Sequence, residues 1–292
     1  MSGAAWAALS GVGFGLFQAL NAKAVRNLGS VYTSTLLQLL VAAAILAAAA
    51  LATEDLGTLR DTSAWGITAF ALAGMIHFFI GWTTLNLSQA RIGAARTSPL
   101  LSTTPLFGIA FGAALASQVP GALAALGIAL TIGGAYLVAD PGGGQRAPLR
   151  DSTFALITAC AWSLSAIFTL EGLEELDSPL LGVTVGMFAA ALAYAAPLAL
   201  SRESFKPASE PWDALALKLA AGVVVALATW GRWVALDDVD VAVVLALNLI
   251  SVPVVLLVAP LISGRHVEIV TAKIWGGAGL VMLGSLLLIV RD

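Results

Sequence analysis

Apolar residues form ten long runs along this chain, and short polar or glycine-containing links separate them. A helix needs about 20 residues to cross the hydrocarbon core of a bilayer, and each run is about that long. The pattern therefore predicts ten transmembrane helices. Their expected ranges are 4–25, 31–53, 63–86, 93–116, 120–139, 152–171, 179–200, 212–236, 239–262 and 269–290. Because the links are short, we expect neighbouring helices to form antiparallel hairpins.

The order of segments in the first half of the chain recurs in the second half. Residues 92–107 (IGAARTSPLLSTTPLF) correspond to residues 240–255 (DVAVVLALNLISVPVV). Each follows a Trp-containing stretch, at 81–91 and 232–239, and each leads on to a glycine-rich apolar run. A fixed order of apolar segments that occurs twice indicates an internal duplication.

One segment, ADPGGGQRAPLRDS at 139–152, has the composition of a linker. It predicts a first repeat over residues 1–139, a linker over 140–151 and a second repeat over 152–292. With five crossings in each half, the second half enters the membrane from the opposite face. We therefore expect an all-α integral membrane fold of two inverted five-helix repeats, with a site between them near the bilayer midplane.

The composition supports a membrane location. The chain is 59% hydrophobic and 11% charged, and its mean hydropathy is +0.94, whereas globular domains carry about 25% charged residues. The net charge of −3 gives no indication of a nucleic-acid partner. The single cysteine, Cys160, allows no intramolecular disulfide. The first apolar run lacks a preceding basic region and is interpreted as a retained span of a multi-pass protein in the cell (inner) membrane.

These features resemble the EamA-like ten-helix branch of the drug/metabolite transporter superfamily. The similarity rests on the ordered set of a Leu before each short link (Leu85 and Leu236), a proline in the next span (Pro105 and Pro253) and a glycine-rich last helix. The sequence departs from the usual pattern after the second proline-containing span, where Arg265 follows a glycine in place of Glu. The resemblance implies a secondary transporter that moves small metabolites, frequently outward, by alternating access. No GxxxxGK[ST] nucleotide-binding loop is present, in agreement with this expectation.

Polar side chains inside the spans are candidates for substrate binding, because a polar group in a membrane span is costly. They concentrate in the first, third, fourth, sixth, eighth and ninth spans, the helices that the resemblance also assigns to the cavity. The candidate substrate-binding residues are Gln18, Asn21, His77, Trp82, Ser102, Trp162, Trp230, Trp233 and Asn248.

Several of these residues allow two interpretations. Gln18 and Asn21 share a helix face, and they would serve either a ligand or an interhelical hydrogen bond. His77 is either a neutral buried histidine or a proton or ligand site. Asn248 lies in an apolar segment and needs polar partners. Of the tryptophans in the third and eighth spans, we expect at least one to face the solute.

A second group of residues is assigned to gating or hinge roles: Lys23, Arg96, Pro105, Glu171, Arg232 and Pro253. Each proline removes a backbone donor and disturbs the carbonyl one turn earlier, around Leu101 and Leu249. A freed carbonyl deep in the membrane must find another partner or face a wet cavity, and Thr103, Thr104 and Ser251 are well placed to help. We favour fixed bends with cavity-facing carbonyls over hinges.

Lys23 and Glu171 occupy equivalent positions in the two repeats. Either each gates its own side, Lys23 near Arg96 or an acid and Glu171 near Arg232, or both extend to the membrane interface. The orientation of the protein is ambiguous. The resemblance places both termini in the cytoplasm, whereas the positive-inside rule then leaves most Lys and Arg residues outside.

The sequence favours a transporter over two other classes. A polytopic membrane enzyme acting on a lipid-like substrate would need paired acids or clustered histidines, but the two histidines, His77 and His266, lie on separate segments. A sensor or scaffold is disfavoured because no soluble domain is evident. We expect no metal and no cofactor. The expected partners are a small-molecule solute and the lipid bilayer, and transport could be coupled to protons. The fifth and tenth spans, which have few polar groups, either brace each half or form a homodimer surface.

Overall fold

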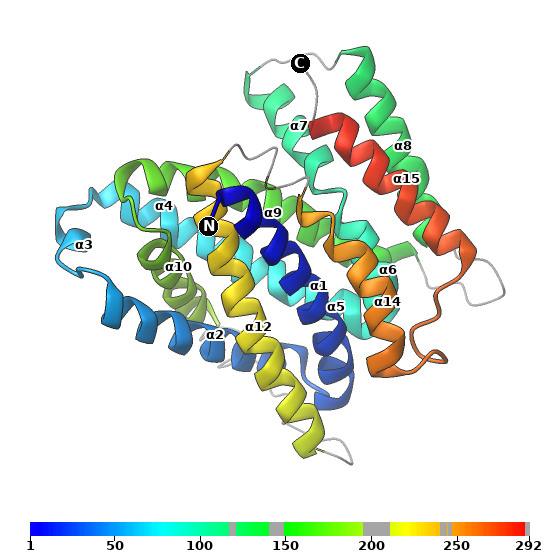
Figure 1. The fold of residues 1–292 in the computed structure, drawn as a ribbon, viewed down its shortest axis with the longest axis horizontal. Coiled ribbons are helices and arrows are strands. Elements are labelled where there is room, and N and C mark those ends of the chain that lie inside the picture. The colour runs from blue at the N-terminus through cyan, green and yellow to red at the C-terminus, as the bar shows by residue number, and fades with distance from the viewer. Residues whose placement is uncertain (117–120, 140–148, 195–210, 240–243, 245–246, 290–292) are drawn as a thin grey trace.

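The computed structural model describes residues 1–116, 121–139, 149–194, 211–239, 244 and 247–289, and this part of the chain is helical, without β-strands (Figure 1). The helices are α1 (Gly3–Leu28), α2 (Val31–Thr53), α3 (Thr58–Asp61), α4 (Ala64–Gly74), η1 (Met75–Gly81), α5 (Trp82–Ile92), α6 (Ala94–Leu101), α7 (Thr104–Ala116), α8 (Ala122–Ala139), α9 (Leu149–Glu175), α10 (Pro179–Ala193), α12 (Pro211–Asp238), α14 (Ser251–Ser263) and α15 (Ala272–Ile289). The all-helical class predicted from the sequence is confirmed for the described residues.

Serine residues fix the start of several helices. Ser2, Ser30, Ser63 and Ser178 stand at the N-caps of α1, α2, α4 and α10, and each side chain accepts a hydrogen bond from a backbone N–H in the first turn. Such a bond satisfies one of the donors that have no partner within the helix. Pro179 follows the last of these caps, at a position where its missing N–H costs nothing.

The helices follow the predicted spans closely, with informative differences. Five described segments are long and apolar enough to cross a membrane, and they are Gly3–Leu28, Val31–Thr53, Ala64–Ile92, Arg150–Glu175 and Trp212–Asp238. That ten helices cross the bilayer stays a prediction. The fourth span is broken into α6 and α7, and only the second half of the ninth, α14, is described as a helix. Most of the expected 140–151 linker lies outside the described residues, and α9 already begins at Leu149.

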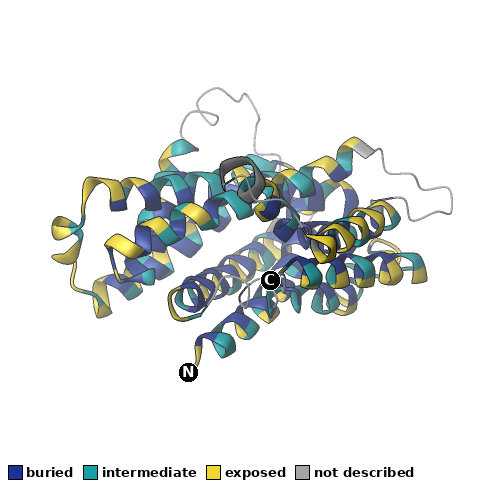
Figure 2. Ribbon diagram, turned by 90° about the horizontal axis from the view of Figure 1, so that it is seen from above, coloured by how far each residue is buried: buried dark blue, intermediate teal, exposed yellow. Residues whose placement is uncertain are grey.

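The helices pack in pairs from distant parts of the sequence. α1 packs along α12 and α14, while α9 packs along α4, η1, α5 and α7. α10 contacts α2 and α4, and α8 pairs with α15 beside the rest of the bundle (Figure 1). Large apolar side chains cover the outer faces, including Leu192, Leu261 and Trp212, which are 76%, 74% and 79% exposed. Exposed residues follow the outward sides of the helices (Figure 2), as expected where lipid is the solvent.

α8 and α15 approach so closely that only glycine fits at their contact. A Cβ atom at Gly134 would lie 2.6 Å from the carbonyl oxygen of Gly277, and one at Gly127 would lie 2.9 Å from the carbonyl oxygen of Gly284. Small residues allow this approach in lipid, where packing holds helices together. The homodimer expected on these two helices stays a prediction.

Neighbouring glycines of α8 provide a matched test of this contact. We expect Gly134→Ala to lower the free energy of unfolding by about 1–3 kcal/mol, because the new methyl group meets backbone atoms that cannot move aside. A Cβ atom at Gly133 would meet nothing within 4 Å among the described residues, so Gly133→Ala should be neutral or slightly stabilising. Thermal unfolding in detergent measures both. Equal effects would show that the α8–α15 contact is looser than described.

Candidate functional site

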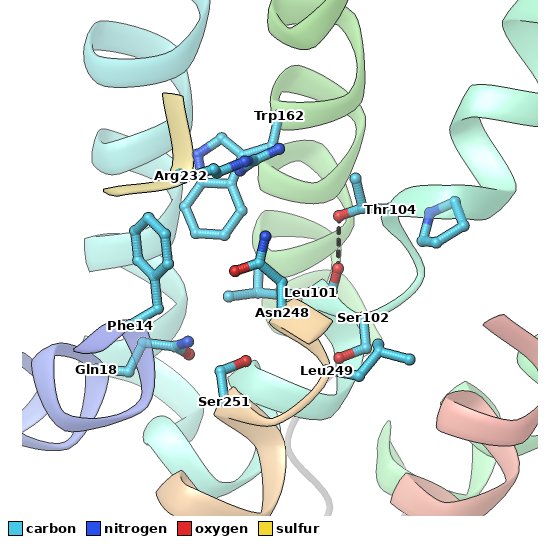
Figure 3. A pocket seen from close by; sticks show the side chains of 11 residues that line it. Phe14, Gln18, Leu101, Ser102, Thr104, Trp162, Arg232, Asn248, Leu249 and Ser251 are labelled. Carbon is cyan, nitrogen blue, oxygen red and sulfur yellow. Dashed lines mark hydrogen bonds between the residues drawn. The ribbon is translucent and has the colours of Figure 1, made fainter. Parts of the chain in front are cut away.

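A cavity of about 60 Å³ lies where the broken fourth and ninth spans meet α1, α9 and α12. Its lining residues are Phe14, Gln18, Leu101, Ser102, Thr104, Pro105, Trp162, Arg232, Asn248, Leu249 and Ser251 (Figure 3). The volume has room for about four water molecules, at roughly 15 Å³ each. As it stands, the cavity has room only for a small group.

The helix breaks supply the polar backbone of the cavity wall. α6 ends at Leu101, whose carbonyl oxygen accepts a hydrogen bond of 2.6 Å from the Thr104 hydroxyl. The Leu249 carbonyl accepts from the backbone N–H of Val252 at 3.0 Å. Each carbonyl therefore has a partner, and Thr104, one of the residues expected to help, is the partner of Leu101.

The two prolines stand just inside the start of a helix, so they do not bend the middle of one. Pro105 is the second residue of α7, and Pro253 is the third residue of α14. The first turn of a helix tolerates proline because its N–H would have no partner there. Pro105 lines the cavity and Pro253 does not.

Four buried polar atoms at the cavity have no hydrogen-bond partner in the described structure. They are Oε1 of Gln18, Nε1 of Trp162, and both Nδ2 and Oδ1 of Asn248. The Gln18 side chain points into the space between Phe14 and Ser251 in Figure 3. Leaving a buried polar atom without a partner costs about 1–3 kcal/mol. These atoms form a set of donors and acceptors that suits a polar ligand.

Arg232 places a positive charge at the same cavity. The residue is 6% exposed, and no carboxylate pairs with it among the described residues. Figure 3 shows its guanidinium beside the ring of Trp162, at the opposite end of the cavity from Gln18 and Ser251. The cavity therefore combines a cationic end with an amide- and hydroxyl-bearing end.

An aromatic cluster forms one wall and extends behind it. The Phe14 and Trp162 rings have centroids 6.2 Å apart, and His77 stacks on Trp162 at 5.3 Å with an angle of 13° between the rings. His77 lies in η1, a π-helical turn, which is a distortion often found at functional sites. A Cβ at Gly81, the last residue of η1, would lie 2.7 Å from Trp162 Nε1. η1 thus holds the Trp162 indole in place.

His77 does not line the cavity. It stacks on the side of Trp162 and so lies behind the cavity wall. Its Nδ1 lies 3.0 Å from the Ser165 hydroxyl oxygen. Ser165 in turn donates to the Trp162 carbonyl at 3.0 Å, so the Nδ1–H of His77 donates to Ser165. Nε2 is then an acceptor, and it has no partner in the described structure.

The structure brings six of the sequence-predicted site residues together at the cavity: Gln18, Ser102, Pro105, Trp162, Arg232 and Asn248. The other predicted residues lie elsewhere. Trp82 packs between Phe17 and Phe78, and Trp233 stacks on Phe70.

Trp230 packs against Trp6, so none of the three tryptophans of the third and eighth spans lines the cavity. Trp162, from the sixth span, occupies that place. Asn21 belongs to a separate network, which bonds it to Asn86 and Gln89.

The charged residues predicted to gate the two sides have other partners than expected. Lys23 donates to the carbonyl oxygen of Ile262 at 3.1 Å. Glu171 accepts from the Trp65 indole N–H at 3.4 Å, and no ion pair joins it to Arg232 in the described part of the chain. Arg96 lines a second, polar pocket together with Arg26 and Glu268.

Lys218 is the clearest residue that the sequence-based prediction missed. It is fully buried on α12 and donates to side-chain oxygens of three other helices. The sequence does contain an indication of this role, because Lys218 is the only charged residue in the apolar stretch between positions 214 and 228. The described residues contain no group of three His, Cys, Asp or Glu side chains that could hold a metal ion.

Comparison with known proteins adds two findings. Residues 1–139 match the family model described as "EamA-like transporter family". Sixteen chains of solved structures also match. One of them, described as "Crystal structure of protein", aligns with 97% of this chain and 96% of its own, at a TM-score of 0.64 and 20% sequence identity. At that identity the likeness shows the fold alone. No curated protein matches the chain.

Proposed function

We propose that this chain, whose residues 1–139 belong to the EamA-like transporter family of the drug/metabolite transporter superfamily, is a secondary transporter for a small amphipathic solute that carries a carboxylate. An amino-acid-like solute fits this description. In this proposal the protein lies in the cell (inner) membrane, works by alternating access and exports its solute, the direction that the family resemblance favours.

The observation that carries the proposal is the buried guanidinium of Arg232. A charge in an apolar interior costs several kcal/mol unless it is paired and hydrogen-bonded, and no described carboxylate pairs with this one. Guanidinium groups bind carboxylates through two parallel hydrogen bonds. A carboxylate solute in the cavity would supply the missing anion.

The remaining lining agrees with an amphipathic solute. The faces of Phe14 and Trp162 suit an apolar group, because aromatic rings offer large apolar area at one side of the cavity. The Gln18 amide, whose Oε1 has no partner in the described structure, suits a polar group such as an amine at the other end, and the Asn248 amide lies between the two ends (Figure 3). A carboxylate at Arg232 would thus lie across the cavity from the amine-binding end.

The small volume of the cavity supports a mechanism in which the walls move. About 60 Å³ is well below the roughly 300–1,000 Å³ of typical ligand pockets. Entry and release therefore need the broken segments at Ser102 and Asn248 to separate. Backbone breaks of this kind are tolerated in a membrane where they line a cavity.

The pairing of helices supports two related repeats. If the first five spans correspond to the last five, the α1–α12 pair corresponds to the pair of α9 with α4, η1 and α5. The α1–α14 pair likewise corresponds to the α9–α7 pair, and α8 and α15 correspond to each other. All of these pairs are present. An inverted duplication would generate this exchange of partners.

Transport by the purified protein in liposomes tests the proposal. Leucine and leucinamide have nearly the same shape but differ in the carboxylate, and phenylalanine and phenylalaninamide form a second pair. We expect uptake of at least one of the acids to exceed that of its amide by about tenfold or more, since loss of a charge-assisted bidentate pair costs over 1.4 kcal/mol. Empty liposomes are the control. Equal uptake of acid and amide, or no uptake above empty liposomes, would contradict the proposal.

A further inference from the structure

Lys218 on α12 lies in a cage of amide oxygens, separate from the cavity. Its Nζ donates to Asn21 Oδ1 on α1, to Gln38 Oε1 on α2 at 2.8 Å and to Asn86 Oδ1 on α5 at 3.4 Å. A lysine ammonium has three N–H donors and no acceptor. The three oxygens therefore match the protonated form of Lys218 one to one, and they tie four helices together at one point.

Two of the three amides are fixed in this orientation by further bonds. Asn21 Nδ2 donates to Asn86 Oδ1 and to Gln89 Oε1, both at 2.6 Å. Asn86 Nδ2 donates to the Thr35 hydroxyl at 2.7 Å. Rotating either asparagine amide would break these bonds. Gln38 differs, because its Nε2 is buried and has no partner in the described structure.

Among the described residues, no carboxylate pairs with the Lys218 ammonium. The side chains that face Lys218 from α1, α2 and α5 are the neutral amides of Asn21, Asn86 and Gln38. α9 and α10 also pack on α12, and no titratable side chain of either helix bonds to Lys218 in the described part of the chain. Within the described part of the chain, the lysine is therefore held by hydrogen bonds to neutral groups, with no counter-ion to oppose the departure of its proton.

The Gln38 amide can serve both protonation states. A neutral amine has two N–H donors and one lone pair, so one of its three neighbours must become a donor. Turning the Gln38 amide by half a rotation would present its Nε2–H to the lone pair of Lys218 without breaking another bond. The Gln38 amide thus has two orientations, one for the protonated and one for the neutral form of Lys218.

We propose that Lys218 is the proton-binding site that couples solute transport to a proton gradient, with the Gln38 amide as its switch. The inference rests on the proposed transport function. In the coupling step the ammonium releases one proton to water on the side to which the protein is open, leaving a neutral amine, and it takes one up on the other side.

The network has a structural connection to the solute cavity. Asn21 lies one turn after Gln18, which lines the cavity, and α12 carries both Lys218 and Arg232. α1 and α12 pack along each other, and Ser10 of α1 donates to the Ala228 carbonyl of α12 at 2.7 Å. A change at Lys218 therefore acts on the same two helices that hold both ends of the solute site.

The test follows protons and solute in the same liposomes. Purified protein is reconstituted with a pH-sensitive dye inside, and radiolabelled leucine and phenylalanine are added under a clamped membrane potential. For the wild type, we expect leucine or phenylalanine movement to change the internal pH and an imposed pH gradient to drive accumulation. Exchange of labelled for unlabelled solute without a gradient gives the coupling-independent rate.

Variants separate coupling from folding. K218Q removes the titrating group, and K218R keeps a charge that does not titrate in proteins. Both should lose the pH-driven accumulation while keeping exchange. Q38M should weaken the accumulation and leave exchange intact, and it remains informative where the Lys218 variants do not fold. K273Q, which alters a lysine of α15 outside the network, is the matched control and should behave as the wild type.

The outcomes distinguish this inference from the proposed function. Two results would overturn the role of Lys218 and leave the transport function standing. One is solute movement by the wild type without a change of internal pH, and the other is K218Q protein that a proton gradient still drives to accumulate solute. Absence of solute movement in the wild type would overturn the transport function and this inference with it.

Discussion

Replacing Arg232 with Gln is expected to raise the half-saturation concentration for a carboxylate solute by at least about 30-fold, because removing one side of a buried charged pair costs about 2–5 kcal/mol. Transport of the matching amide should hardly change, since the amide makes no ion pair. Liposome uptake of leucine and leucinamide by the wild type and R232Q measures this difference. R232K keeps the positive charge but loses the planar guanidinium that binds a carboxylate through two hydrogen bonds. Its half-saturation concentration for leucine should lie between those of the wild type and R232Q.

The free protein provides an independent check on Arg232. Without solute, the guanidinium is a buried charge with no described acidic partner, so R232Q should be as stable as the wild type or more stable. Thermal unfolding in detergent measures this. A variant that unfolds at much lower temperature would instead show that Arg232 is paired within the protein and serves its structure.

The sequence-predicted residues that line the cavity share one property, which is a strong polar group in the middle of an apolar span. Gln18, Trp162 and Asn248 line the cavity, and a buried polar group in lipid needs a reason to be there. Trp82 and Trp233 also bring a polar group into an apolar span, but only a single indole N–H each. Their rings instead fill space between helices, because an indole has far more apolar surface than polar surface.

Other features depend on neighbours that the sequence does not reveal. The oxygens around Lys218 come from α1, α2 and α5, so no local pattern on α12 announces the cage. The prolines indicated breaks in the fourth and ninth spans, and Thr104 is among the residues expected to bond a freed carbonyl, but the position of each proline within its helix differs from the expectation. Each proline lies in the first turn of a new helix, and the Thr104 hydroxyl satisfies the Leu101 carbonyl.

Glu268 joins four elements at the end of α1 that lies away from the N-terminus. Its carboxylate accepts from Arg26 Nη1 at 2.7 Å and from the backbone N–H groups of Ala94 and Ala95 at 3.1 and 3.0 Å. Arg26 also donates to Ser263 at the end of α14. The two N–H groups open α6, and the start of a helix favours a negative charge. The Glu268 carboxylate thus joins α1 and α6 to the segment before α15, and Arg26 extends the junction to α14.

The backbone before α6 is shaped to admit this carboxylate. Gly93 has φ of +79°, a region that L-residues rarely adopt, and a Cβ there would lie 2.6 Å from Glu268 Oε2. The Glu268 side chain is 1% exposed and that of Arg26 21% exposed. The second well-formed pair, Arg91 with Asp151, is 38% and 16% exposed, with N–O contact at 2.6 Å. The two pairs have similar length and differ in burial.

Glu268→Gln is therefore expected to lower the free energy of unfolding by about 3 kcal/mol, because it leaves Arg26 partly buried without its counter-ion. Asp151→Asn removes a pair of the same length at the surface, where such pairs contribute about 0–1 kcal/mol. Thermal unfolding of both variants in the same detergent gives the comparison. The stability lost in E268Q should also depend less on added salt than that lost in D151N, since buried pairs are screened less than exposed ones. If the two variants lose the same stability, the Glu268 junction is no stronger than an ordinary surface pair.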